Sequence, residues 1–86
     1  MQDSLMDFSN RTGDELFRLL AKRASEELSD QSDFDQFTGM LGAALIAVAG
    51  VLREPVENGQ DVDKLINFSS RWLRTLLEPV ANRGGP

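Results

Sequence analysis

The chain has 86 residues, of which 41% are hydrophobic and 27% are charged, the composition of one small globular domain. It contains neither cysteine nor histidine, which excludes disulfide bonds, thiol nucleophiles and the usual zinc sites. The net charge of −5 argues against binding nucleic acid by broad neutralisation of phosphates. We expect a single domain over residues 1–86 with no enzymatic activity, metal or cofactor.

The charge is unevenly distributed along the chain. Residues 1–38 carry nine acidic and four basic side chains, a net charge of −5, whereas residues 39–86 carry five of each. The first residues are acidic and lack the apolar segment of a secretory signal. Together with the lack of cysteine, this pattern predicts a cytoplasmic protein.

Helical periodicity and capping residues predict an all-α fold, a compact bundle of three helices. Thr12 and Glu15 have the spacing of a capping box and precede an apolar-periodic stretch. They predict a first helix over about 13–29. Residues 4–11 are expected to add a short N-terminal helical turn.

The second helix is predicted over about 33–54, between the capping residue Ser32 and Pro55. Proline disfavours the helical conformation of the residue before it, so the helix is expected to end there. No charged residue occurs from Gly39 to Leu52. These 14 residues are fewer than the roughly 20 that a bilayer span needs, so we expect a buried helix and no membrane span.

The third helix is predicted over about 61–78, with Asp61 as its N-cap and Pro79 at its end. Apolar residues fill about half of its circumference and polar residues the other half. The chain ends in a segment rich in glycine and proline. We expect flexible ends at about 1–10 and 81–86.

The second helix has two apolar faces on opposite sides. Large side chains form one of them: Phe34, Phe37, Leu41, Leu45, Val48 and Leu52. Small residues form the other, here called the small-residue stripe: Gly39, Ala43, Ala47 and Gly50. Small side chains let another helix approach closely. We predict that the stripe packs within the chain, in a homodimer or against a helix of another protein, and the small size of the chain favours a homodimer.

Five carboxylates lie within ten residues, around the expected connection between the first two helices. This acidic segment consists of Glu26, Glu27, Asp30, Asp33 and Asp35. Its spacing does not match a calcium-binding EF-hand loop, which requires glycine where this chain has Thr38. The segment is predicted to be either a solvated loop or a charged patch that meets a basic partner.

These features predict a small acidic helical module that binds another protein as an accessory or regulatory subunit and forms a homodimer. One alternative is a nucleic-acid-associated regulator that uses the basic face of the third helix, formed by Lys64, Arg71 and Arg74. Another is an acidic protein that imitates a nucleic acid and inhibits a protein that binds one. In the main interpretation the contact surfaces are the small-residue stripe and the acidic segment.

Overall fold

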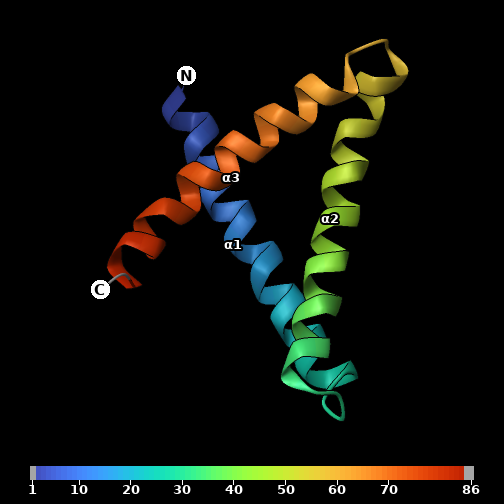
Figure 1. Cartoon of the computed structure of the whole chain (residues 1–86), viewed down its shortest axis with the longest axis vertical. Helices are drawn as coiled ribbons and strands as arrows, with labels where there is room; N and C mark the ends of the chain where they lie inside the picture. The colour runs from blue at the N-terminus through green and yellow to red at the C-terminus, as the bar shows by residue number, and fades with distance from the viewer. Residues whose placement is uncertain (1, 85–86) are drawn as a thin grey trace. The chain divides into compact units, whose positions relative to one another are not determined.

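The computed structural model describes residues 2–84, and over this range the protein is all-α with three helices: α1 (Gln2–Glu27), α2 (Asp33–Glu57) and α3 (Val62–Gly84) (Figure 1). The predicted all-α class and the number of helices are thereby confirmed. Met1, Gly85 and Pro86, which belong to the ends predicted to be flexible, lie outside the described residues.

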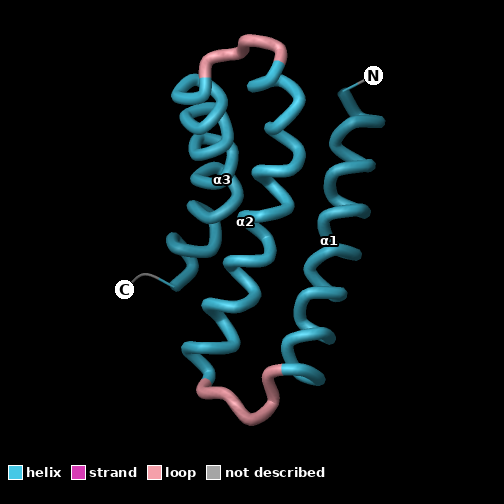
Figure 2. Tube along the Cα trace, turned by 90° about the vertical axis from the view of Figure 1, so that its right-hand side faces the viewer, coloured by secondary structure: helices cyan, strands magenta, loops and turns pink. Residues whose placement is uncertain are grey.

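The chain divides into two units, and the division falls inside α2. The first unit contains α1 and the part of α2 up to Val48, and the second contains α2 from Ala49 onward and α3. Residues 28–32 connect the helices of the first unit, and residues 58–61 connect those of the second (Figure 2). Each unit thus consists of two helical segments joined by a short turn.

α1 begins at Gln2, much earlier than the predicted start at about residue 13, and the predicted N-terminal turn is part of it. Thr12 and Glu15 therefore lie inside the helix, so the prediction that they start it was wrong. Ion pairs between acids and arginines one turn later contribute a little to the stability of this exposed helix. They are Asp7 with Arg11 at 3.7 Å, in the part before the predicted start, and Asp14 with Arg18 at 3.0 Å.

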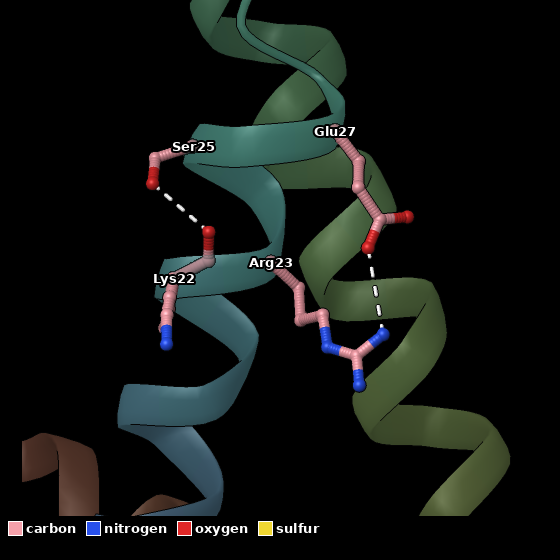
Figure 3. A network of polar contacts seen from close by, with 4 residues as sticks. All are labelled: Lys22, Arg23, Ser25 and Glu27. Atoms are coloured by element: carbon pink, nitrogen blue, oxygen red, sulfur yellow. Dashed lines mark hydrogen bonds and ion pairs between the residues drawn. The ribbon is translucent and has the colours of Figure 1, made fainter.

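The C-terminal turns of α1 carry local polar contacts of the same kind (Figure 3). Arg23 Nη1 lies 3.5 Å from Glu27 Oε2, one turn further along the helix. Ser25 Oγ donates a hydrogen bond of 2.9 Å to the carbonyl oxygen of Lys22. These contacts stay within α1, so they stabilise the helix without fixing it to another element.

α2 begins as predicted but ends later. The amide of Asp35 donates to Ser32 Oγ at 3.1 Å, which confirms Ser32 as the N-cap. The helix continues through Pro55 to Glu57, beyond the predicted end at about residue 54. Proline lacks the amide donor and its ring crowds the carbonyl four residues earlier, but its own carbonyl accepts a hydrogen bond from Gln60, so a last turn forms after it.

The turn after α2 explains where the helix stops. Gly59 has a φ of 93°, a left-handed conformation that favours glycine. Its amide donates to the carbonyl of Val56 at 3.0 Å, and the amide of Gln60 donates to that of Pro55 at 3.0 Å. This pair of bonds is the Schellman motif, which satisfies the last carbonyls of a helix.

α3 has the predicted N-cap and an extended C-terminus. The amide of Lys64 donates to Asp61 Oδ1 at 3.2 Å, which confirms the capping role of Asp61. Pro79 lies inside the helix, which runs to Gly84 and not to the predicted end at about residue 78. As at Pro55, the proline removes one donor while the carbonyls after it can still accept, so the helix continues past it.

Burial is slight in both units, and it is concentrated near the connecting turns. Ala24 of α1 is 6% exposed and is the one buried apolar residue among those that the structure describes. The half-buried residues of the first unit are Ser9, Thr12, Leu20, Ala21, Leu28, Gln36, Met40, Gly42 and Ala44. Those of the second are Leu52, Pro55, Leu65 and Ser69. In each unit, most of these residues lie in the helical turns nearest the connection.

Candidate functional site

The small-residue stripe of α2 does not form one continuous contact. Its first member, Gly39, packs within the first unit, because a Cβ atom placed on it would lie 2.9 Å from Leu28 Cδ1. Ala43 and Ala47 are exposed, and so is Gly50, where a Cβ atom would meet nothing within 4 Å. Packing within the chain, one of the three roles predicted for the stripe, is thus observed at Gly39.

The opposite, bulky face of α2 is largely uncovered. Phe34 is 72% exposed, and its ring centroid lies 6.3 Å from that of Phe37 one turn later. Leu41, Leu45 and Val48 are also exposed, whereas Leu52 is half-buried. A row of exposed large apolar side chains on one helix face is typical of a surface that another chain covers.

The acidic segment surrounds the connection between α1 and α2, and all five of its side chains are exposed. Glu27 is paired with Arg23 of α1, and Asp30 Oδ1 accepts a weak bond of 3.4 Å from the side-chain amide of Gln31. Among residues 2–84, no group of three or more carboxylates is arranged to hold a metal ion. The geometry is that of a solvated connection with an exposed negative charge.

The polar side of α3 carries the basic residues that were considered for nucleic acid binding. Lys64, Arg71 and Arg74 are all exposed. Asp63 and Glu78 belong to the same polar half of the helix. This mixture of signs gives a solvated helix surface and not the continuous basic face of a nucleic-acid-binding helix.

The clearest unpartnered surface lies on α3, and the sequence-based site prediction did not include it. Every side chain from Ser70 to Arg83 is exposed. Five large apolar side chains of this half of the helix, here called the α3 apolar face, are between 43% and 57% exposed: Trp72, Leu73, Leu76, Leu77 and Val80. The apolar periodicity of α3 shows that these residues share a face, but it does not show that the face is exposed.

Phe68 extends this face by one turn toward the N-terminus of α3. Its ring meets that of Trp72 edge-on, with centroids 6.0 Å apart and an interplanar angle of 73°. Edge-to-face contact is a favourable arrangement for two aromatic rings. The pair therefore forms a pre-organised aromatic end to the α3 apolar face.

Two shallow grooves run along α3. One is lined by Ser70, Leu73, Arg74, Leu77, Glu78 and Ala81, and the other by Phe68, Arg71, Trp72 and Thr75. All of these residues belong to one helix, so neither groove encloses a small molecule as a ligand pocket does. Grooves between rows of side chains are instead the shape that receives the side-chain ridges of a second helix.

α2 also has the length and apolar composition of a helix that could cross a membrane. The apolar window that gives this result contains no buried residue in the structure, so the prediction of a buried second helix was wrong. Its uncharged stretch from Gln36 to Leu52 rises about 25 Å at 1.5 Å per residue, against the roughly 30 Å of a hydrocarbon core. Core helices of soluble proteins share this length and composition but are mostly buried, whereas the apolar window of α2 is not.

Comparisons with protein families, curated proteins and solved structures found no match to this chain. The exposed apolar faces of the helices are therefore the features from which a function is inferred.

Proposed function

We propose that this protein is a small acidic helical module that binds other protein chains as an accessory or regulatory subunit, with a second copy of itself among its partners. One observation carries the proposal: Ala24 is buried, while large apolar side chains on all three helices are exposed. Contiguous exposed apolar surface on a soluble protein marks a site of association.

Energetics support an association that contributes to folding. Burying a large apolar side chain stabilises a protein by about 1.5–3 kcal/mol, whereas ordering each residue costs roughly 1.5 kcal/mol. One buried alanine and thirteen half-buried residues among those described supply little against that cost. Covering the exposed faces of α1, α2 and α3 with another chain supplies the missing burial.

The chemistry of the exposed residues favours binding over catalysis. The sequence lacks histidine and cysteine, the side chains most often used as general base and thiol nucleophile. The grooves on α3 are open and formed by a single helix. An accessory or regulatory subunit needs neither a reactive side chain nor an enclosed pocket.

Two measurements on the full chain test this proposal. Sedimentation over a wide range of concentrations should give a mass that rises above the 9.5 kDa of one chain. Affinity capture with mass spectrometry should give a protein partner that binds the purified chain in a fixed ratio. A chain that unfolds cooperatively, stays at 9.5 kDa throughout and captures nothing would contradict the proposal.

The acidic segment offers a separate test of how such a partner is recognised. A cluster of exposed carboxylates attracts a basic partner and so raises its association rate at low salt. Reversing two of them, with Asp30→Lys and Asp33→Lys together, should slow association severalfold at low salt and leave helicity unchanged. An unchanged association rate would show that the acidic segment is a solvated connection without a recognition role.

α2 gives a specific reason to test a bilayer as well. The full chain, mixed with vesicles of neutral and anionic phospholipids, should remain with the soluble fraction on flotation if its apolar faces bind proteins. Co-flotation that withstands high salt would instead indicate insertion of α2, and it would contradict the protein-binding proposal for that helix.

A further inference from the structure

We propose that the C-terminal half of α3 pairs in antiparallel orientation with the same segment of a second copy of this chain. The inference rests on the proposed function and names the surface through which two copies associate. The segment, Ser70 to Arg83, includes the whole α3 apolar face and is exposed throughout.

The arrangement of side chains around α3 gives this segment the form of a pairing helix. At 100° per residue, the α3 apolar face occupies an arc of about 140°, more than a third of the circumference, and Arg83 falls within that arc. Ser70 and Ala81 border it on one side, with Arg74 just beyond them, and Pro79 and Phe68 border it on the other. Arg71 and Glu78 lie on the far side of the helix, so pairing of the apolar faces leaves them in solvent.

The uncharged borders favour a second copy over a different partner. Helices that choose a different partner usually do so through charged residues beside the apolar seam. The residues at the borders of this face, Ser70, Ala81 and Pro79, carry no charge, so they bring no like charges together when the face meets itself. A self-complementary patch of this kind is what a two-fold symmetric dimer requires.

Arg83 decides the orientation. It falls on the apolar side of α3, near the C-terminal end of the segment. In a parallel pair it would lie beside Arg83 of the second copy, which is unfavourable. In an antiparallel pair centred between Leu76 and Leu77, it lies at the level of Ser70 of the second copy, and Leu73 lies opposite Val80.

The exposed area is enough for a specific but modest interface. A large apolar side chain that is about half exposed presents roughly 80–100 Å². Phe68 and the α3 apolar face together supply six such side chains. Two copies would then bury about 1,000–1,200 Å², the lower limit for specific association. We therefore expect a dimer that dissociates on dilution and not a permanent one.

The first experiment compares two variants of the full chain by sedimentation. Leu76→Glu places a carboxylate at the centre of the α3 apolar face, whereas Asn67→Glu adds the same charge on the polar side of α3. The wild type and Asn67→Glu should approach twice 9.5 kDa at high concentration. Leu76→Glu should dimerise at least tenfold more weakly, with unchanged helicity by circular dichroism.

The second experiment tests orientation, and it remains informative if Leu76→Glu does not fold. The chain has no cysteine, so single variants give unambiguous crosslinks. Leu73→Cys mixed with Val80→Cys should form the mixed disulfide under mild oxidation, because these positions are opposite in the antiparallel pair. Each variant alone should crosslink poorly, since identical positions lie about 10 Å apart along the axis, beyond disulfide reach. Efficient crosslinking of each variant to itself would overturn the antiparallel orientation.

Failure of this surface differs from failure of the proposed function. If Leu76→Glu dimerises as the wild type does, the α3 surface is wrong, while the proposed module still self-associates. Pairing through α3 is overturned if the wild type stays monomeric. It is also overturned if the wild type binds phospholipid vesicles and Leu76→Glu removes that binding while dimerisation is unchanged. In the monomeric case, affinity capture of a stoichiometric partner decides whether the proposed function stands.

Discussion

The part of the first unit next to the connection at residues 28–32 and the C-terminal half of α3 differ in how closely their side chains pack. Around residues 28–32, small residues let two helices approach closely: Ala24 is buried, and Gly39 meets Leu28. From Ser70 onward, the large side chains of α3 remain exposed. The difference teaches that in so small a chain the short turns organise local contacts of small residues, while the large residues further from the turns stay exposed.

The largest effect is expected at the buried end of this comparison. Ala24→Leu adds bulk where α1 is most closely packed, and overpacking of this kind costs about 1–3 kcal/mol of unfolding free energy. Ala47→Leu makes the same enlargement at an exposed position of α2 and should change stability by less than about 0.5 kcal/mol. Thermal melts at one fixed concentration check both variants. An Ala47→Leu variant as unstable as Ala24→Leu would show that another helix covers the small-residue stripe.

The turn of the second unit is expected to be sensitive through its backbone. Gly59→Ala forces a side chain into a left-handed conformation, at a cost of about 1–2 kcal/mol. Gly13→Ala is the matched control, because Gly13 is helical and a Cβ atom there meets nothing within 4 Å. The control should raise the melting temperature slightly while Gly59→Ala lowers it. Equal effects would mean that the α2–α3 turn is not held in the observed conformation.

The two N-caps provide a smaller, paired comparison between the units. Ser32→Ala and Asp61→Ala each remove one side-chain acceptor from a helix start, and each should cost about 1 kcal/mol. The loss at Asp61 should be the more salt-dependent, because its carboxylate also interacts with the helix dipole. Denaturant melts at low and high salt measure both effects. If neither variant lowers the stability, these helix starts fray in solution.

The smallest effects are expected at two glycines of α2. Alanine is favoured over glycine inside a helix by up to about 1 kcal/mol. Gly50→Ala should gain most of that amount, because its surroundings are open. Gly39→Ala should gain less, since the new methyl group must displace the end of Leu28. Melting temperatures that rank the two variants in the opposite order would place a close partner at Gly50.

Local chemistry in the sequence was sufficient for the helix starts at Ser32 and Asp61, because each cap depends on a few neighbouring atoms. It was insufficient for the helix ends. The prolines at positions 55 and 79 were expected to stop their helices, yet both helices continue, because a proline removes one donor and leaves later carbonyls free to accept. Thr12 shows the converse error, since a capping pattern also occurs inside a long helix.

The candidate surfaces were less predictable than the helices. The sequence marked the small residues of α2 as a set, but a Cβ atom would contact Leu28 at Gly39 and nothing at Gly50, so these two glycines do not share one contact. The exposure of Leu73 and Leu76 was not predictable, because their periodicity is the same in a buried helix and in an uncovered one. Periodicity shows which residues share a face, whereas what covers that face depends on distant parts of the chain or on other chains.

Trp72 has a consequence of a practical kind. It is the one tryptophan of a chain that has no tyrosine, and it stands on the exposed half of α3. Intrinsic fluorescence therefore reports the surroundings of a single indole ring in contact with Phe68, far along the sequence from the turn at residues 28–32. A blue shift with rising concentration would report that another chain covers that ring. Trp72 is thus an intrinsic fluorescent probe of the C-terminal half of α3.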